Sequence, residues 1–175
     1  MFNKILVPLD GSVLAEQALA PASRVAERFG STLLLLRVVT PERSAPGLQH
    51  LTLRPETVTA VPPRPLLEEA EAYLAGLRLP TPGLPIETEV VAGAAPEMII
   101  LTAAESGADL IVMSTHGRAG LIRLLYGSVA EAVLRGATVP VLLVPSRVFL
   151  RREVAGSKRE VVVPLGSNRP HIGHI

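Results

Sequence analysis

The sequence contains no cysteine and no tryptophan, and aromatic residues make up 3% of it. The missing cysteine excludes disulfides and thiolate chemistry and is compatible with a cytosolic protein. So few aromatic rings leave single-stranded nucleic acid without a stacking surface. The formal net charge is +1, which gives neither nucleic acid nor an anionic membrane surface an electrostatic reason to bind. We therefore expect no nucleic-acid partner.

Long apolar runs are missing too. A membrane-spanning helix needs about 18 or more consecutive apolar residues, whereas the run Leu33–Val39 is short and is interrupted by Arg37. A strand pattern begins at Lys4, and no signal-peptide pattern precedes it. We expect a cytoplasmic protein without a membrane partner. Apolar residues make up 48% of the 175 residues, enough for one folded domain with a sizeable core.

Short apolar runs alternate with segments of helical spacing. The runs at 4–9, 32–39, 110–113 and 139–144 predict buried strands, the alternation at 86–91 predicts an edge strand, and helical patterns follow at about 12–30, 66–77, 96–106 and from 128 onward. Pro21 lies inside the first helical pattern, where it should kink the helix or remove a hydrogen bond. The alternation predicts a doubly wound parallel α/β sheet, with ligands beyond the carboxyl ends of its strands.

Two segments do not fit this alternation. The segment at 40–65 is rich in proline and has no sustained period, so we expect a long connection there. The tail at 159–167 repeats the pattern of 3–12 without its Asp. We expect a domain at 1–146 and a C-terminal extension at 147–175, which is either the remnant of a second repeat or a strand that docks on a sheet edge. His171 and His174 lack a third ligand between them, which argues against a metal site there.

A glycine-rich loop separates the strand at 110–113 from the helix that opens at Ser128. The free N–H groups and the dipole of a helix start favour an anion, so the loop predicts a phosphate cradle. Ser128 has a second interpretation as a simple helix cap, because the residues up to Glu131 fit a capping box. Asp10 likewise fits either a ligand contact or a local Asx turn. His116 and Arg118 can pair with phosphate oxygens or remain solvated.

Two motifs in this sequence resemble those of the universal stress protein family. Ser114–Gly117, nine residues and Gly127–Ser128 resemble the signature of its ATP-binding members, which is Gly, two residues, Gly, nine residues, then Gly and Ser or Thr. Ser114 stands at the first glycine of that signature. Val7–Ser12 resembles the opening motif of the family, and the whole resemblance covers about residues 2–146.

The resemblance implies a fold, a ligand and an assembly. The fold would be the Rossmann-like one of adenine nucleotide alpha hydrolases, a five-stranded sheet of order 3-2-1-4-5, and two copies would form a homodimer through Val139–Val144. ATP, with Mg²⁺ or Mn²⁺, would be a signal or structural ligand in the stress response. Adenine would lie near Pro8, Leu9, Asp10 and Val38, the ribose near Met113 and Ser114, and the phosphates on Gly117, Gly127, Ser128, Val129 and Ala130.

Signatures of fast nucleotide turnover are missing. The sequence has no GxxxxGK[ST] motif, no lysine in the glycine loop and no Ser/His/Asp arrangement in the context of a nucleophile. We therefore expect no catalytic residues and at most slow ATP hydrolysis. Two alternatives remain open at this point. One is a nucleotide-free dimeric interaction module of the same fold, and the more distant one is an adenylyl-transferring enzyme.

Overall fold

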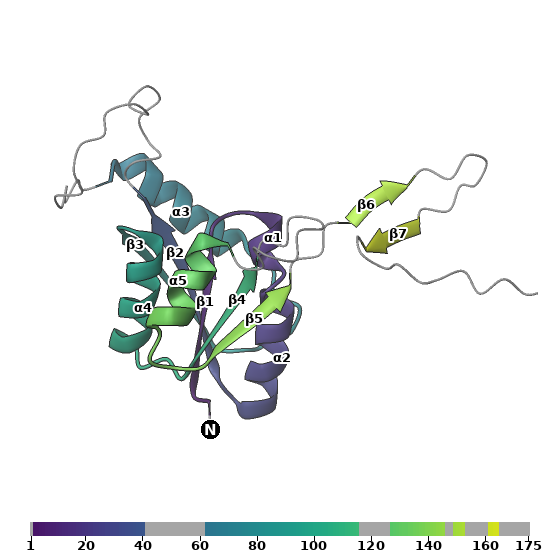
Figure 1. Cartoon of the computed structure of the whole chain (residues 1–175), viewed down its shortest axis with the longest axis horizontal. Helices are drawn as coiled ribbons and strands as arrows, with labels where there is room; N and C mark the ends of the chain where they lie inside the picture. Colours follow the sequence, from purple (N-terminus) through teal and green to yellow (C-terminus); the bar gives the residue numbers. More distant parts are fainter. Residues whose placement is uncertain (1, 41–61, 116–126, 146–148, 153–160, 165–175) are drawn as a thin grey trace, which may run out of the picture.

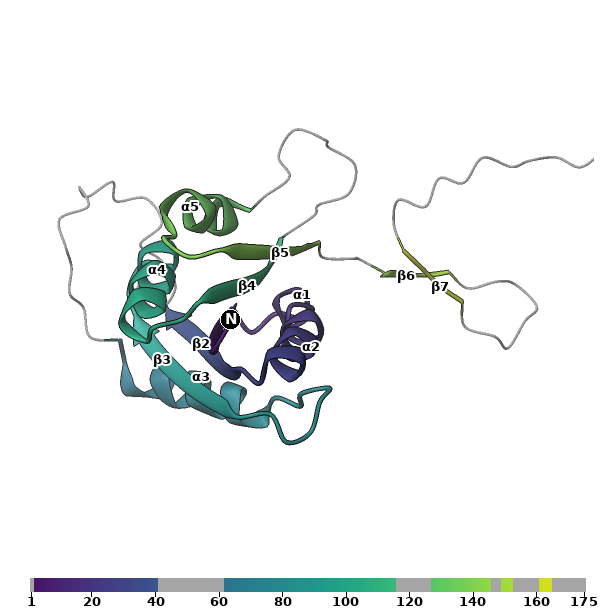
Figure 2. The ribbon, with the colours of Figure 1, turned by 90° about the horizontal axis from the view of Figure 1, so that it is seen from below.

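The structure is a computed structural model that describes residues 2–40, 62–115, 127–145, 149–152 and 161–164. Five strands form a parallel sheet in the order β3-β2-β1-β4-β5, and helices cover both of its faces (Figure 1, Figure 2). The strands are β1 Lys4–Leu9, β2 Thr32–Val39, β3 Ile86–Ala92, β4 Leu110–Thr115 and β5 Val141–Pro145. The helices are α1 Val13–Glu16, α2 Leu19–Phe29, α3 Arg64–Gly76, α4 Ala95–Glu105 and α5 Ser128–Gly136. The predicted fold and strand order are confirmed.

The two faces of the sheet pack into separate cores. Alternate side chains of β1 point to opposite sides, so Ile5 and Val7 pack under α1, α2 and α3, while Leu6 packs under α4 and α5. All three are fully buried, as expected for a central strand covered on both faces. Figure 2 shows the two helix layers on either side of the sheet.

The first helical pattern is two helices rather than one. α1 ends at Glu16, and α2 begins at Leu19. A proline ring clashes with the carbonyl four residues earlier, and for Pro21 that residue is Gln17, at the break. The break leaves Pro21 in the first turn of α2, where its missing N–H costs no helical hydrogen bond. Gly30 ends α2 in the left-handed conformation, with φ 69°, which glycine adopts without strain.

Some strand boundaries differ from the sequence predictions. β4 continues to Thr115 and so includes two residues expected in the glycine loop, while β5 begins at Val141 rather than at 139. β3 is an edge strand as predicted, but its first residues, Ile86 to Thr88, are exposed on both faces, whereas Val90 and Val91 pack against the two cores. The helix pattern at 66–77 begins two residues earlier, because Pro65 is tolerated in the first turn of α3.

The tail contributes two short strands. β6 Phe149–Arg152 pairs antiparallel with β7 Val161–Pro164 in a sheet of their own. The repeated pattern at 159–167 therefore does contain a strand, but β7 pairs with β6, which the sequence analysis missed, rather than with an edge of the larger sheet. Its origin as a remnant repeat stays a prediction. The proline-rich connection lies mostly outside the described residues, as do His171 and His174. Within the described parts of the chain, no helix has the length and apolar character needed to cross a membrane.

Candidate functional site

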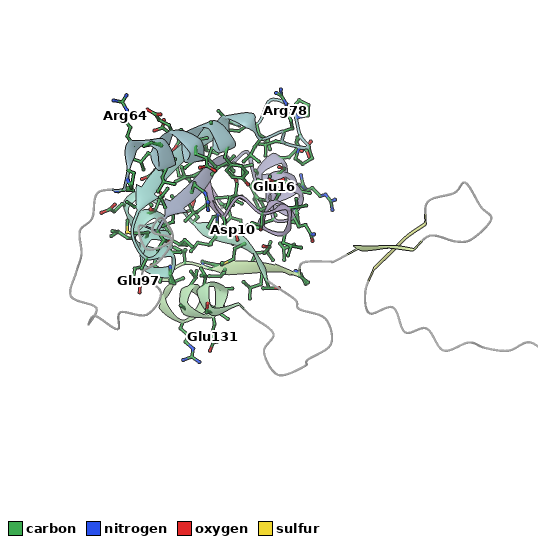
Figure 3. All side chains as sticks on the ribbon, turned by 90° about the horizontal axis from the view of Figure 1, so that it is seen from above. Asp10, Glu16, Arg64, Arg78, Glu97 and Glu131 are labelled. Carbon is green, nitrogen blue, oxygen red and sulfur yellow. The ribbon has the colours of Figure 1, made fainter. Side chains whose placement is uncertain are left out.

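The order of the strands reverses at β1 and β4. These two strands are neighbours, and β1 leads into α1 on one face whereas β4 leads toward α5 on the other. Such a switch point is where open α/β sheets bind ligands, beyond the carboxyl ends of the strands. Figure 3 looks onto this end of the sheet, with Asp10 near its centre and Arg64, Glu97 and Glu131 at the periphery.

β1 and β4 separate toward that end. Their register pairs only Ile5 with Leu110 and Leu6 with Ile111. By contrast, β1 pairs with β2 along its whole length, and β4 pairs with β5 from Ile111 onward. The carboxyl halves of β1 and β4 therefore share no ladder in the described structure. The backbone groups of the two strands beyond Leu6 and Ile111 are therefore not paired with one another, and the strand ends Leu9 and Thr115 are 4% and 5% exposed.

A tight turn follows β1. The Ser12 N–H donates to Asp10 Oδ1 at 2.9 Å, and the Ala15 N–H donates to Ser12 Oγ at 3.1 Å. Asp10 thus forms the Asx turn that the sequence left open, and Ser12 caps α1. Gly11 has φ +84°, which a side chain would strain. We call Leu9–Ser12 the β1 turn. Its hydrogen bonds fix its shape without excluding a ligand contact by Asp10.

The end of β4 is buried. Met113, Ser114 and Thr115 are 6%, 7% and 5% exposed, and Ser114 pairs with Val144 of β5. Ser114 therefore belongs to the strand and not to the loop in which we placed it, because the ladder with β5 continues past Met113. A side chain at this position points into a packed environment, and serine is small enough to fit where the signature has glycine.

Within the described residues, no side chain caps the start of α5. Gly127, not Ser128, is the N-cap residue, with φ −56°. The capping-box interpretation of Ser128 is wrong, because the helix begins at Ser128 itself, one residue earlier than that motif needs. The Glu131 carboxylate accepts instead from Arg135, at 2.6 Å between Oε1 and Nη2.

Three N–H groups at the start of α5 have no partner within the helix. The first backbone bond of the helix runs from the Glu131 N–H to the Gly127 carbonyl. The preceding N–H groups, those of Ser128, Val129 and Ala130, have no carbonyl within the helix to bond to. Ser128 is also exposed, so its hydroxyl can face the same ligand. This arrangement fits the phosphate cradle predicted from the sequence.

The other predicted residues are only partly placed. Pro8 and Leu9 end β1, and Val38 is 9% exposed on the α4 and α5 face of β2. Gly117, Arg118 and His116 lie outside the described residues. No cluster of three His, Cys, Asp or Glu side chains suited to a metal ion occurs in the described parts of the chain.

Sequence reasoning missed three polar side chains beside the β1 turn. Arg37 of β2 donates from Nη1 to the Leu9 carbonyl at 3.5 Å, and Tyr73 of α3 donates its hydroxyl to Glu16 Oε1 at 3.1 Å. Burial first, and then the bond to Glu16, raise the pKa of Tyr73 well above its ordinary value. The available signal was Arg37 itself, a charged residue near the carboxyl end of an otherwise apolar strand.

Comparisons with known proteins agree with this geometry. A family model described as the universal stress protein family matches residues 1–145. Universal stress protein MJ0531 of Methanocaldococcus jannaschii is 34% identical over 148 residues, which cover 82% of each chain. Universal stress protein Rv2005c of Mycobacterium tuberculosis is 32% identical over 141 residues, which cover 79% of this chain but only 44% of that longer relative.

Solved structures show the same fold. The structure of MJ0577 from Methanocaldococcus jannaschii has a TM-score of 0.59 and 28% identity, over 88% of this chain and 99% of that one. A universal stress protein in complex with cAMP has a TM-score of 0.53 and 24% identity, over 83% of this chain and 98% of that one.

Proposed function

We propose that this chain, which belongs to the universal stress protein family, binds ATP between the carboxyl ends of β1 and β4 and holds it as a signal or structural ligand in the stress response. The observation that carries the proposal is that the ladder between these two strands ends at Leu6 and Ile111. The end of this ladder lies at the switch point, and the start of α5, which no described side chain caps, follows the same strand β4. A crevice flanked by free N–H donors suits a ligand with a flat base and an anionic tail.

Each part of ATP has candidate contacts in this chain. The base would lie against the end of β1 and against β2, the ribose against the end of β4, and the phosphates against the glycine loop and the start of α5. The residues that we propose are Pro8, Leu9, Asp10 and Val38 for the base, Met113 and Ser114 for the ribose, and Gly117, Arg118, Gly127, Ser128, Val129 and Ala130 for the phosphates.

Mg²⁺ or Mn²⁺ would accompany the phosphates. Because the described residues offer no cluster of three metal-ligating side chains, the phosphate oxygens themselves would supply most of the ligands. A magnesium ion commonly binds in this way, through phosphates, waters and one or two carboxylates. The ion would neutralise phosphate charge, and α5 would hold the same phosphates by its N–H groups. The sequence has no lysine in the glycine loop and no Ser/His/Asp arrangement in the context of a nucleophile. Hydrolysis of ATP would therefore be slow or absent.

The relative solved with cAMP supports an adenine nucleotide in this fold. We include other adenine nucleotides as competitors of ATP for that reason, since the residues on the base side would meet the same adenine. We further propose that the protein is cytoplasmic and forms a homodimer through Val139–Val144, the outer strand of the sheet. A nucleotide-free dimeric module is the function that remains if no nucleotide binds.

Calorimetric titration of the full chain with Mg-ATP, and separately with cAMP, tests the proposal. The test variant is Gly127→Val with Ser128→Ala, which adds bulk at the N-cap of α5 and removes the hydroxyl. The control is Ser106→Ala, a serine at the C-cap of α4, shortly before β4 begins and so at the opposite end of the sheet. Hydrogen bonds to charged groups contribute about 1.5–3 kcal/mol each, so the double variant should weaken ATP binding at least about tenfold.

Two results would overturn the proposal. Wild-type protein that is folded but binds no adenine nucleotide at millimolar concentration would leave only the interaction module. Binding that survives the double variant unchanged would place the phosphates away from α5. The Ser106→Ala control should bind like wild type, because it changes a serine far from the crevice.

A further inference from the structure

Side chains from three elements surround the β1 turn. Arg37 reaches over it from β2, with Nη1 3.5 Å from the Leu9 carbonyl. A Cβ built at Gly11 would lie 3.6 Å from Arg37 Nη2, which is ordinary van der Waals contact. The guanidinium therefore bonds Leu9 and lies beside Gly11, two residues further along the turn. In the described structure no carboxylate lies within 4 Å of it, so its contacts are with the turn rather than with a salt-bridge partner.

The helix that follows the turn is held from a different direction. Glu16 ends α1, and its carboxylate accepts the Tyr73 hydroxyl of α3 at 3.1 Å. Arg37 and Asp10 are both close enough to Tyr73 to act on its pKa in opposite senses, Arg37 lowering it and Asp10 raising it. Figure 3 shows Asp10 and Glu16 near one another at this end of the sheet. The four groups therefore form one polar cluster.

The cluster has no other evident task. Leu9 and Asp10 are the residues proposed to meet the base, and both lie in the β1 turn. A turn of glycine and polar residues with one Asx hydrogen bond has little stiffness of its own. A ligand site works best when residues outside it hold its contacting groups in place, because less order must then be gained on binding.

We propose that Arg37 is a positioning residue for the base side of the nucleotide site, and that the Glu16–Tyr73 hydrogen bond supports it by holding α1. The inference rests on the proposed function. Arg37 fixes the Leu9 carbonyl at the start of the turn, so that Asp10, the next residue, faces the adenosine part of the ligand. The phosphates, held by α5, do not depend on it. Losing Arg37 therefore weakens adenosine and ATP by the same factor.

Calorimetric titrations of the full chain with adenosine and with Mg-ATP test this equality. Arg37→Met keeps the apolar stem and removes the hydrogen bond, so both affinities should fall about fivefold, the worth of one net hydrogen bond. Tyr73→Phe should lower the affinities for adenosine and for Mg-ATP by the same factor, which should be smaller than the factor for Arg37→Met. Ser128→Ala is the contrast, since it should weaken Mg-ATP and leave adenosine unchanged. Arg37→Lys should restore both, because a single bond to a carbonyl does not need the planar fork of arginine.

The outcomes separate the two proposals. Wild-type protein that binds neither ligand rejects the proposed function and this inference with it. Wild-type protein that binds both, with Arg37→Met unchanged in affinity but lowered in thermal stability, rejects the inference alone, because Arg37 is then only structural. A loss confined to Mg-ATP also rejects it, since Arg37 would then serve the phosphates. Equal losses for both ligands, restored by Arg37→Lys, support it.

Discussion

At the scale of single residues, two buried serines differ in one hydrogen bond. Ser23 and Ser31 are both 0% exposed. The Ser31 hydroxyl donates to the Phe2 carbonyl at 2.7 Å, whereas the Ser23 hydroxyl has no partner within the described structure. Ser23 lies inside α2 and Ser31 just after it. The two serines therefore allow a comparison between a buried hydroxyl with a hydrogen-bond partner and a buried hydroxyl without one among the described residues.

We expect opposite effects when each serine becomes alanine. Ser31→Ala should lower the free energy of unfolding by about 1–2 kcal/mol, because the part-buried Phe2 carbonyl loses its donor. Ser23→Ala should be neutral or raise it by up to about 1 kcal/mol, because a desolvated hydroxyl is removed and alanine is the better helix former. Urea unfolding of both variants measures the difference. Equal losses in the two variants would mean that Ser23 has a partner too.

Single residues were also where sequence reasoning was least complete. The alternatives for Asp10 and Ser128 differ by which neighbouring N–H group each oxygen meets, and that depends on backbone angles at Gly11 and Gly127. Asp10 forms the Asx turn, whereas the N-cap residue of α5 is Gly127 and not Ser128. Arg37 was visible only as an interruption of a strand, because its role depends on the β1 turn, 25 to 28 residues earlier in the sequence. Contacts of that separation leave no periodic pattern.

At the scale of elements, β1 and β4 are held together at one end and separate at the other. The Asp109 carboxylate, just before β4, accepts the N–H groups of Asn3 and Lys4, at 2.6 and 3.1 Å. The Asp109 N–H donates back to the Lys4 carbonyl at 2.8 Å. These bonds lower the pKa of Asp109 below its usual value of 3.8. Asp109 thus fixes the closed end opposite the proposed crevice.

Asp109→Ala should destabilise the fold near neutral pH, and the loss should shrink in acid. A carboxyl whose pKa is lowered by folding contributes its stability above the unfolded value and loses it as pH falls through the folded value. Thermal unfolding from neutral pH to below 3.8 measures the wild-type advantage. Asp109→Asn is the control, because its amide oxygen can still accept both N–H groups without titrating. A wild-type advantage that is constant in acid would contradict this account.

The elements themselves followed well from the sequence. Continuous apolar runs located β1 and β2 with the boundaries found in the structure, because strands buried on both faces leave no polar alternation to blur their ends. The split between α1 and α2 was missed, although Pro21 indicated a disturbance. Helical spacing continues across the break, so periodicity alone could not separate a kink at Pro21 from a break at Gln17.

At the scale of the whole molecule, the two edges of the sheet differ in protection. Alternation showed only that strands and helices succeed one another, and the order 3-2-1-4-5 came from the family resemblance. That order makes β3 and β5 the edges. β3 presents an exposed Glu87 and a half-buried Glu89, and charged side chains discourage pairing between sheets. β5 carries no charge from Val141 to Pro145, and its Leu142 is 39% exposed.

The proposed homodimer through β5 therefore has a direct test. Leu142→Lys places a charge on the apolar edge, and lysine on an edge strand opposes strand pairing, so the variant should be monomeric where wild type is dimeric. Light scattering at micromolar concentration measures this. Leu101→Lys is the matched control, because Leu101 is 46% exposed on α4, away from β5. A monomeric wild type would reject the dimer. The Leu101→Lys control should stay dimeric. If Leu142→Lys stays dimeric as well, the interface lies elsewhere.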